Sequence, residues 1–324
     1  MEKYLVADYS NFNKYGGVEK NAELITKDIE RLIKLKIKRA KYKYELFLLL
    51  FKSLLRIKFV NYFICYKNST LIGFLFKLTG SKLIIRINNS PESYLYWGKL
   101  TSLLSHILKI KLVKSEIVIF NSKRIKDYYS LFSKGNKNLY FLNNNYEFNN
   151  IEIKLSKKNK IYLASRLSWE KNLHNAYKIF KSISKDIGYE VFAFTSTKNN
   201  NLEIKNFKNL EYKYNDIYVS LSFFEGMPNM VFHALFKGSG LLLSNCWSHV
   251  EIYNLLSNFD LENRIRIISS DFKDKEYLIN EIKILKNKIK KENLDIVQKN
   301  LSNLREQLNK NYKFTLHKIC NLIS

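Results

Sequence analysis

The pattern that most narrows the possible folds is a repeated alternation of two kinds of segment. Short apolar runs rich in β-branched and aromatic residues predict strands, and the stretches between them carry apolar residues at helical spacing. Such an alternation is typical of βα units that build a parallel sheet. In the first half the expected strands are 4–8, 59–66, 82–87, 116–120 and 138–142, and the expected helices include 18–33, 70–78, 93–110 and 123–132.

The same alternation starts again after a polar segment, rich in Asn and Lys, at 143–160. Its expected elements are strands at 160–166, 189–196, 216–222 and 240–245, a helix at 172–186, and closing helices from 273 onward. A chain of 324 residues is long enough to build two cores. We therefore expect an α/β protein with one Rossmann-like domain over 1–155 and a second over 156–324.

Composition places the chain among globular proteins and argues against several classes. Apolar residues make up 46% of the sequence, far more than a disordered chain carries. Cys65, Cys246 and Cys320 are widely separated and form no CxxC pair, so neither a disulfide framework nor a zinc site is indicated. No signal peptide is recognisable, and the longest apolar runs, 46–51 and 71–76, are too short to span a bilayer. A reduced, cytoplasmic compartment is expected.

The charge is strongly positive, with 55 Lys or Arg against 29 Asp or Glu, and predicts an anionic partner. Residues 31–58 hold ten of these bases and the single acid Glu45, interleaved with large apolar residues. They predict a basic amphipathic helix that lies on an anionic membrane surface; a core-packed helix with a solvated lysine face is an equally good interpretation. A non-catalytic protein that binds nucleic acid or another polyanion stays an alternative, although no nucleic-acid motif is present and no such partner is expected.

The segment SLSFFEGMPNMVFHAL (220–235) carries the clearest chemistry. It combines the end of a strand, a turn that contains Gly and Pro, and the start of a helix. In parallel α/β sheets, ligands bind at the carboxyl ends of strands, where helix N-termini present N–H groups. Glu225 is then expected to project into this region, together with the N–H groups of Asn229, Met230 and Val231. An acid beside such N–H groups suits a ligand with hydroxyls and phosphates, and a nucleotide sugar has both.

Three motifs, in the expected order, resemble glycosyltransferase family 4, also called group 1, among the GT-B enzymes. SFFEGMPNMVFHA (222–234) is similar to the family's Ser-x-x-Glu-Gly-x-Pro-Asn-x-x-x-Glu-Ala segment. ASRLSWEKN (164–172) resembles its Gly-Arg-Leu-x-x-x-Lys-Gly turn, and NKYGGVEK (13–20) resembles its first Gly-Gly loop, with Gly16 and Gly17 as donor-binding residues. The resemblance implies a GT-B fold, with two domains facing each other across a cleft. The first would bind the acceptor; the second, with the terminal helices, would bind the nucleotide sugar.

The resemblance also implies roles for three side chains. Cleaving the bond between sugar and diphosphate builds negative charge on the departing phosphate, which a guanidinium and an ammonium can stabilise without a metal. Arg166 and Lys171 are the candidates; the other interpretation is that both are exposed turn residues of a basic protein. Glu225 takes the family's role of contacting hydroxyls of the donor sugar, with a helix N-cap acid as the alternative. Neither a metal nor another cofactor is expected.

The match departs from the family pattern at several positions. His233 stands where the family has a second Glu that holds the ribose hydroxyls, and an imidazole lacks the two acceptor oxygens of a carboxylate. Ser165 and Asn172 replace the leading and trailing Gly of the Arg motif, and the helix beside the base pocket is expected to be shortened to 203–215. The lost acid keeps open a further hypothesis, an impaired accessory subunit of the same fold.

Acceptor-binding candidates lie at the ends of two strands of the first domain. Arg86, Asn88 and Asn89 come at the end of strand 82–87, where they can hydrogen-bond to sugar hydroxyls or phosphate. A cap for the following helix, built by 90–92, is the other interpretation of this stretch. Asp8 ends the first strand and is a further candidate.

Together these expectations define one leading hypothesis. The resemblance implies a retaining hexosyltransferase that moves a sugar from a nucleotide-diphosphate donor to a growing glycan. The basic segment adds an acceptor carried on lipid, as in the assembly of bacterial surface polysaccharides, and a location at the cytoplasmic face of the cell membrane.

Overall fold

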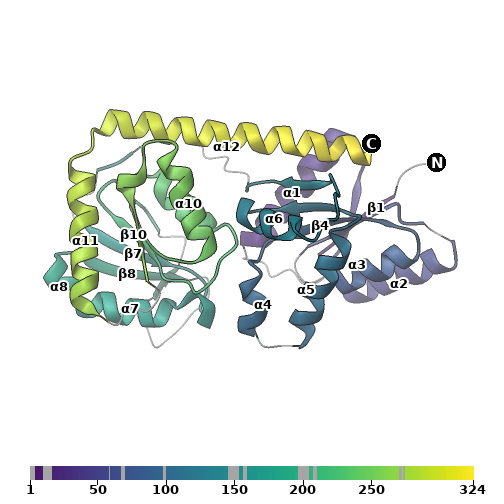
Figure 1. Cartoon of the computed structure of the whole chain (residues 1–324), viewed down its shortest axis with the longest axis horizontal. Coiled ribbons are helices and arrows are strands. Elements are labelled where there is room, and N and C mark those ends of the chain that lie inside the picture. The colour runs from purple at the N-terminus through teal and green to yellow at the C-terminus, as the bar shows by residue number, and fades with distance from the viewer. Residues whose placement is uncertain are drawn as a thin grey trace. The chain divides into compact units, whose positions relative to one another are not determined.

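The computed structural model describes residues 4–9, 17–57, 59–66, 70–97, 100–144, 153–155, 159–195, 204–206, 210–269, 272 and 274–324. The chain forms two compact units. Unit 1 comprises Met1–Asn145 and Leu308–Ser324, and unit 2 comprises Tyr146–Gln307. Each unit contains a parallel six-stranded sheet with helices packed on its faces (Figure 1). The predicted α/β class is therefore confirmed.

The sheet of unit 1 has the strand order β2-β1-β3-β4-β5-β6. Its strands are β1 (Leu5–Asp8), β2 (Ile37–Ala40), β3 (Tyr62–Cys65), β4 (Lys82–Ile87), β5 (Ile117–Phe120) and β6 (Leu139–Phe141). The helices before the linker are α1 (Gly17–Ile33), α2 (Lys43–Leu54), α3 (Thr70–Leu78), α4 (Glu92–Trp97), α5 (Leu100–Leu112) and α6 (Lys123–Ser130). All strand pairs of the sheet are parallel, so the carboxyl ends of its strands share one edge.

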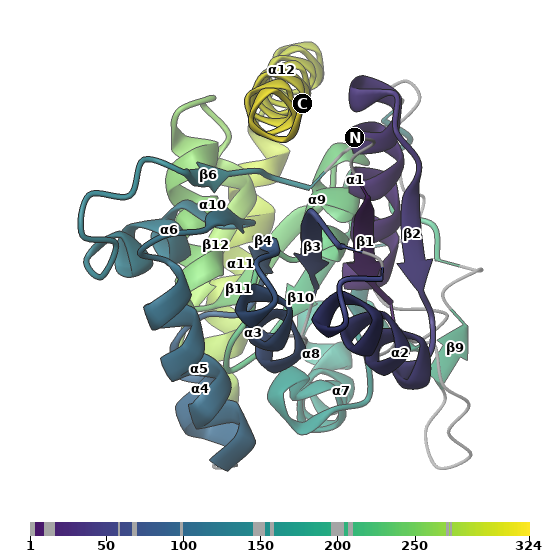
Figure 2. The same cartoon turned by 90° about the vertical axis from the view of Figure 1, so that its right-hand side faces the viewer.

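Unit 1 has a separate apolar cluster on each face of its sheet, which explains why its central strands are mostly apolar. Leu5 and Ala7 of β1 belong to the cluster covered by α1, whereas Val6 between them belongs to the cluster covered by α2 and α3. Figure 2 shows α1 and α2 on opposite sides of the strands. Alternate residues of one strand therefore serve two cores.

The sheet of unit 2 has the strand order β12-β11-β10-β7-β8-β9. Its strands are β7 (Lys160–Ala164), β8 (Glu190–Thr195), β9 (Ile204–Asn206), β10 (Ile217–Ser220), β11 (Gly240–Ser244) and β12 (Ile265–Ile268). The helices are α7 (Leu173–Ser182), α8 (Ser184–Ile187), α9 (Asn229–Phe236), α10 (Trp247–Ser257), α11 (Lys275–Lys290) and α12 (Leu294–Ile323), with short 3-10 helices η1 (Trp169–Lys171) and η3 (Glu262–Arg264). Here too every pair is parallel.

Several elements differ from the sequence-based prediction. Residues 31–58 do not form one helix, because α1 ends at Ile33 and β2 pairs with β1 before α2 begins. The pairing buries Ile37 and Ala40, and this tertiary contact overrides the helical charge pattern. Strand β9 lies within the stretch 203–215, where a shortened helix was expected, and β12 was not predicted.

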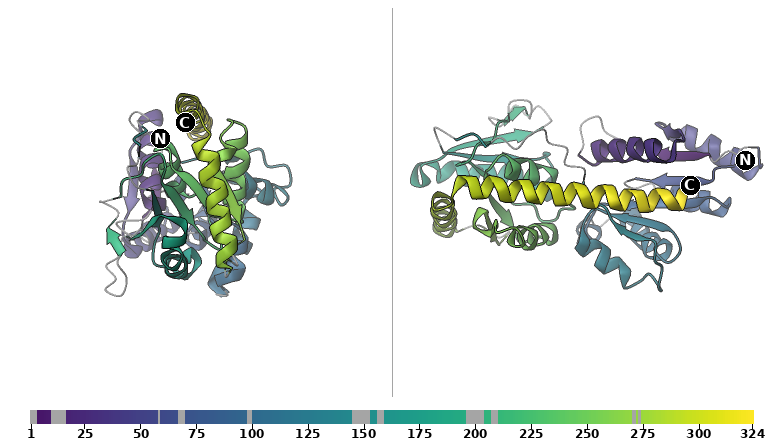
Figure 3. Two further views of the ribbon diagram at one scale, coloured as in Figure 1. Left: turned by 90° about the vertical axis from the view of Figure 1, so that its left-hand side faces the viewer. Right: turned by 90° about the horizontal axis from the view of Figure 1, so that it is seen from above.

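The last helix, α12, is one uninterrupted helix from Leu294 to Ile323 (Figure 3). Its final residues, from Leu308 onward, belong to unit 1, whereas the prediction assigned the whole C-terminal region to the second domain. Leu316 and Ile319 are buried in the same cluster as β1. The Tyr312 hydroxyl donates a hydrogen bond of 2.7 Å to Asp28 of α1, so this helix end completes the core of unit 1.

Among the described residues, no helix combines the length and the apolar character that crossing a bilayer requires.

Candidate active site

The carboxyl ends of β7 and β10 lie next to each other in unit 2. The two strands pair directly, with Leu163 opposite Val219, so the turns that follow them leave the same edge of the sheet. The turn after β7 leads into η1, and the turn after β10 leads into α9. The backbone N–H of Phe223 donates a hydrogen bond of 2.9 Å to the carbonyl of Glu170, which joins the two turns. Two motifs that are separate in sequence therefore form one site.

Lys171 and Glu225 make an ion pair at the centre of this site. The distance between Lys171 Nζ and Glu225 Oε1 is 2.5 Å, and only 12% and 14% of the two side chains are exposed. The Ser222 hydroxyl also donates a hydrogen bond of 3.0 Å to Glu225 Oε1. A charge pair shielded from water in this way interacts more strongly than one on the surface, and both partners are held in fixed positions.

The surroundings of Glu225 favour its charged form. Burial raises the pKa of this carboxyl, but the ammonium of Lys171, followed by His249, lowers it by more. The pKa of Glu225 therefore lies below its ordinary value of 4.5. At neutral pH the side chain is therefore a carboxylate, which can only accept hydrogen bonds.

The lowered pKa of Glu225 predicts how the stability of unit 2 depends on pH. Because folding lowers this pKa, the stabilisation by the carboxylate is complete above 4.5 and is lost as the pH falls through the folded-state value. We expect Glu225→Gln to lower the free energy of unfolding by about 1–3 kcal/mol at pH 7. The difference from wild type should shrink towards pH 3, as urea unfolding measures. A difference that is constant with pH, or one that the exposed control Glu306→Gln reproduces, would contradict this expectation.

Arg166 lies in the same turn, but its guanidinium faces a different acid. The side chain is 61% exposed, and its Nη2 is 3.7 Å from Oε1 of Glu170. The buried carboxylate of Glu170 also accepts a hydrogen bond of 2.7 Å from the Ser168 hydroxyl. The structure thus brings Lys171 and Glu225 together and leaves Arg166 at the exposed side of the turn, where its catalytic role stays a prediction.

Asn172, at the position of the family's trailing Gly, adopts the backbone conformation that glycine favours. Its φ is 51° and its ψ is 23°, which is the left-handed region. Asn enters this region more readily than other residues with a side chain, so the turn keeps its geometry without glycine. This geometry ends η1 at Lys171 and starts α7 at Leu173.

Helix α9 begins at Asn229, directly after the turn that carries Glu225. In an α-helix the first N–H groups do not bond to carbonyls of the same helix, and this applies to Asn229, Met230 and Val231. The hydrogen-bond donors that these three residues share are therefore their backbone N–H groups. The Val231 side chain is buried in the core, and those of the other two are half-buried. The ring of His233, one turn later, lies 5.5 Å from that of the buried Tyr212. The binding of a donor substrate by these N–H groups and by His233 stays a prediction.

The chain at and after the end of β11, the strand next to β10, contributes three residues that sequence reasoning missed: Ser244 ends the strand, Cys246 precedes α10 and His249 lies on α10. The Ser244 hydroxyl donates a hydrogen bond of 2.5 Å to the carbonyl of Ser222, and Nδ1 of the buried His249 lies 3.0 Å from the carbonyl of Ser244. Burial raises the pKa of the Cys246 thiol, but His249 lowers it by more. In turn, burial lowers the pKa of His249, whereas Cys246, and after it Glu225, raise it by more. The charged form of the His249 imidazole is therefore favoured by the acidic groups next to it, Cys246 and Glu225. The sequence signals the strand but not its place next to β10.

The acceptor-binding candidates of unit 1 lie at or near the carboxyl edge of its own sheet. Buried Arg86 donates a hydrogen bond of 2.8 Å from Nε to Asn88 and one of 2.9 Å from Nη2 to Asn144. Asp8 is buried at the end of β1, and Asn89 is half-buried. Arg86 and Asn88, two of the acceptor-binding candidates, therefore contact each other. Asn144 is a further hydrogen-bond partner of Arg86, which the sequence did not indicate.

Of the Gly-Gly loop, Gly17 is the first residue of α1, and Gly16 lies outside the described residues. In the stretch that was the alternative interpretation as a cap, the Ser90 hydroxyl donates a hydrogen bond of 3.2 Å to the side chain of Glu92, the first residue of α4. This contact joins two side chains and does not bond a backbone N–H of the helix, so both interpretations of the stretch stay predictions.

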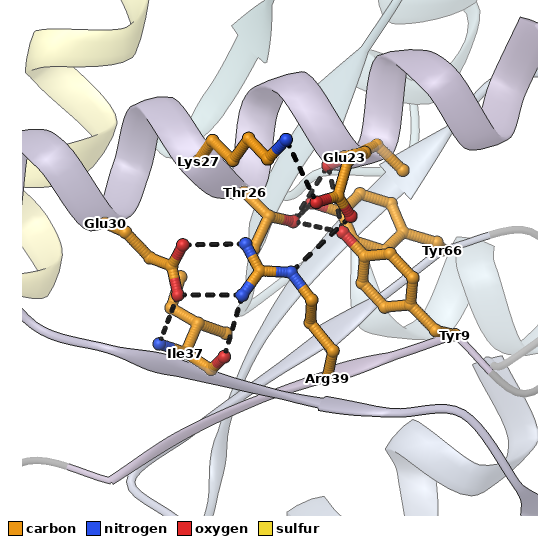
Figure 4. A network of polar contacts seen from close by, with 9 residues as sticks. Tyr9, Glu23, Thr26, Lys27, Glu30, Ile37, Arg39 and Tyr66 are labelled. Atoms are coloured by element: carbon orange, nitrogen blue, oxygen red, sulfur yellow. Dashed lines mark hydrogen bonds and ion pairs between the residues drawn. The ribbon is translucent and has the colours of Figure 1, made fainter.

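A polar network, buried at Tyr9, Thr26 and Tyr66 and partly exposed at Arg39 and Glu30, links α1 to residues on or next to the strands of this sheet (Figure 4). Thr26 of α1 links two phenols, accepting a hydrogen bond of 2.8 Å from Tyr9 and lying 2.9 Å from the hydroxyl of Tyr66. Burial raises the pKa of Tyr66 to about 12, so both rings stay neutral hydrogen-bonding groups. Arg39 on β2 makes two hydrogen bonds, of 2.7 and 3.0 Å, to Glu30. This network holds α1 and the end of β1 in place.

The arrangement of elements is similar to those of known glycosyltransferases. A sucrose-phosphate synthase from Thermosynechococcus elongatus matches with a TM-score of 0.67 and 10% identity, over 99% of this chain and 98% of that one. A glycosyltransferase from Rickettsia africae matches with a TM-score of 0.59 and 13% identity, over 99% and 97% of the two chains. A TarM variant from S. aureus matches with a TM-score of 0.58 and 16% identity, over 86% of this chain.

The chain spans only 58% of the length of that TarM structure. No protein-family model matches the sequence, and a search of curated proteins also finds no match. At identities this low the structural likeness establishes the fold alone. The chain has the GT-B fold that its three motifs predicted.

Proposed function

We propose that this protein is a glycosyltransferase that moves a hexose from a nucleotide-diphosphate sugar to a glycan acceptor. The observation that carries the proposal is the shielded pair of Lys171 and Glu225, held where β7 and β10 end and directly before α9. At this edge the cation Lys171 could bind the diphosphate of a nucleotide sugar, and the carboxylate of Glu225 could accept hydrogen bonds from its sugar hydroxyls. The GT-B fold supports the proposal, because glycosyltransferases are its structural neighbours.

The donor would bind with its diphosphate at the start of α9. The first N–H groups of a helix and its dipole attract phosphate, and the ammonium of Lys171 adds a full positive charge nearby. Glu225 would accept hydrogen bonds from the sugar hydroxyls, and His233 would contact the ribose with one ring nitrogen. Donor binding would thus exchange part of the ion pair between Lys171 and Glu225 for contacts with the ligand.

The chemical step that fits these residues retains the configuration of the sugar and needs no metal. The acceptor oxygen bonds to the anomeric carbon on the same face from which the diphosphate oxygen leaves. That leaving oxygen takes the proton of the acceptor hydroxyl, so the products are a glycoside and a nucleoside diphosphate. Lys171, with Arg166 as a second cation, would stabilise the negative charge that grows on the leaving phosphate.

The acceptor we propose is a glycan carried on lipid, as in the assembly of bacterial surface polysaccharides at the cytoplasmic face of the membrane. The polar residues at and near the edge of unit 1, Arg86, Asn88, Asn89 and Asp8, would contact its sugar or phosphate groups. Neighbours support the choice of ligands for a first test. The TarM variant was solved with fondaparinux, alpha-GlcNAc-glycerol and UDP, and a pneumococcal O-GlcNAc transferase, GtfA, with UDP and GlcNAc.

The test is to incubate the protein with radiolabelled UDP- or GDP-sugars and a lipid extract of bacterial membranes. Transfer to lipid, or slow hydrolysis of one donor, is the expected result, and both should persist in EDTA. Thermal-shift measurements with UDP, GDP and CDP would identify the base. No transfer, hydrolysis or nucleotide binding with any of these ligands would refute the proposal. Nucleic-acid binding that weakens steeply with salt would then favour a polyanion-binding protein.

Replacing Arg166 distinguishes a catalytic cation from an exposed turn residue. We expect Arg166→Ala to lower the rate of donor cleavage about 10- to 100-fold, because a charge-assisted contact with the leaving phosphate is lost. Its melting temperature should stay close to that of wild type, since the side chain is 61% exposed. Arg31→Ala, which removes a guanidinium that is 80% exposed in unit 1, is the control. Equal rates for both variants would assign Arg166 to the solvated surface.

A further inference from the structure

Helix α2 is apolar on the face that it turns to solvent. Its buried residues, Leu46, Leu49 and Ser53, share one side of the helix. The opposite side carries large apolar side chains that are between 52% and 60% exposed, namely Phe47, Leu48, Phe51, Leu54 and, directly after the helix, Leu55. A surface helix of a globular protein normally has polar residues on that side. An outer face built in this way indicates that something other than water covers it.

The two neighbouring helices continue this apolar face. Helix α3 packs between α2 and α5, and all three lie on the same side of the sheet of unit 1 (Figures 1 and 2). On α3, Leu71 and Leu78 are 61% and 68% exposed and lie two turns apart. On α5, the exposed residues recur at helical spacing of three and four, namely Leu100, Leu103, Leu104 and Ile107. We call these exposed side chains of α2, α3 and α5 the apolar surface.

The charge around the apolar surface is almost entirely positive. Residues 41–115, which contain all three helices, hold thirteen Lys or Arg and only two acids, Glu45 and Glu92. The carboxylate of Glu45 is turned to the backbone, where it accepts a hydrogen bond of 2.8 Å from the N–H of Lys41. The exposed bases at the ends of the helices are Lys41, Lys43, Arg56, Lys111 and Lys114. An apolar centre with bases at its margin complements a sheet of anionic lipid.

We infer that the apolar surface inserts into the headgroup region of an anionic membrane. Side chains of α2, α3 and α5 would enter the boundary between headgroups and acyl chains, and the marginal bases would bind lipid phosphates. A second copy of the chain is a less suitable occupant, because pairing two such faces would bring two sets of like charges together. For its biological role the inference rests on the proposed function, since a lipid-linked acceptor is found at this kind of surface.

The first test is flotation of the protein with vesicles of phosphatidylcholine, alone or mixed with phosphatidylglycerol. Binding is expected with the mixed vesicles, and it should persist in part at ~1 M salt, where charge attraction is screened and apolar insertion is not. The double variant Phe47→Ser/Phe51→Ser should lose at least about tenfold in vesicle affinity. Both rings are 58% exposed, so its melting temperature should not fall. Phe314→Ser on α12, where the ring is 62% exposed, is the matched control and should bind like wild type.

A second pair of variants tests the marginal bases. Lys41→Gln/Lys43→Gln/Arg56→Gln should weaken binding to the mixed vesicles and reduce its dependence on salt. The control Lys283→Gln/Lys291→Gln/Lys299→Gln removes the same charge from exposed positions on α11, directly after it and on α12, and should leave binding unchanged.

Failure of binding to both kinds of vesicle would overturn the inference. A dimer in sedimentation that Phe47→Ser/Phe51→Ser disperses, without vesicle binding, would assign the apolar surface to a second copy instead. Donor hydrolysis measured in buffer without lipid tests the proposed function independently of membrane binding. The apolar-surface variants should hydrolyse donor like wild type, whether or not the membrane inference holds.

Discussion

Replacing Lys171 with Ala is expected to lower the rate of sugar transfer about 100- to 1,000-fold. The ammonium is the shielded cation at the edge where β7 and β10 end, and it lies 2.5 Å from Glu225. Without it, the charge on the leaving phosphate would have to be stabilised by backbone N–H groups and the exposed guanidinium of Arg166 alone. Steady-state rates with a soluble acceptor, or rates of donor hydrolysis, measure the loss.

The design of this experiment separates a catalytic role from a structural one. Lys171→Arg keeps the charge and should recover part of the rate, whereas Lys178→Ala removes an exposed lysine of α7 and should match wild type. Removing Lys171 also removes the charge that lowers the pKa of Glu225, so the pH dependence of the remaining activity should shift. A variant that retains full transfer would exclude the proposed role of the pair, whereas one that still binds donor without transfer would agree with it.

Replacing Arg264 with Ala is expected to lower the stability of unit 2 by about 3–5 kcal/mol. The guanidinium is fully buried, with its Nη2 2.9 Å from Oε2 of Glu292, and it donates a hydrogen bond from Nη1 to the carbonyl of Gly238. It also lies over the ring of Tyr214, 4.4 Å from its centroid. These contacts hold the turn between α11 and α12 on the core of unit 2. Without Arg264, the shielded carboxylate of Glu292 would lose the cation that it pairs with. It would then stay charged at a cost in stability, or bind a proton.

Urea unfolding followed by tryptophan fluorescence measures this effect, because two of the three tryptophans, Trp169 and Trp247, belong to unit 2. Burial already raises the pKa of Glu292 despite the nearby guanidinium, so the loss should be greater at pH 8 than at pH 5. The double variant Arg264→Met/Glu292→Leu removes both charges and should recover much of the stability. A single variant as stable as the exposed control Arg31→Ala would show that the buried pair contributes little.

The candidate site shows which parts of a prediction can succeed from one sequence. The segment 220–235 contains its own strand end, turn and helix start, so Glu225 and the first residues of α9 could be assigned to one edge without knowing the rest of the fold. The pairing of Lys171 with Glu225 needed the further fact that β7 and β10 are neighbours. Ser244 at the end of β11 and His249 on the following helix were missed for the same reason, because the apolar run of β11 identifies the strand but not its neighbours in the sheet.

The surface of unit 1 shows a failure of the same kind. The basic pattern of 31–58 predicted one amphipathic helix, either lying on an anionic membrane surface or packed on the core with a solvated lysine face, whereas the structure has the end of α1, β2 and α2 in this stretch. Residues 37–40 form an edge strand that pairs with β1, and Leu46 and Leu49 of α2 are buried in the core of unit 1. The sheet covers some apolar side chains of α2 and leaves the others exposed to solvent. Because α2 is apolar on both sides, hydrophobic periodicity alone cannot predict which side is buried.

Local information in the chain was sufficient for most of the alternation of strands and helices, for the division into two sheets and for the three motifs, because these depend on periodicity and on residues close in sequence; it did not identify β2, β9 or β12. Strand order, the return of α12 to unit 1, the charge environment of Glu225 and the exposure of the apolar surface were decided only by tertiary packing. The physical reason is that burial and long-range pairing depend on which distant segments meet, and the free energy of each contact is set by what surrounds it.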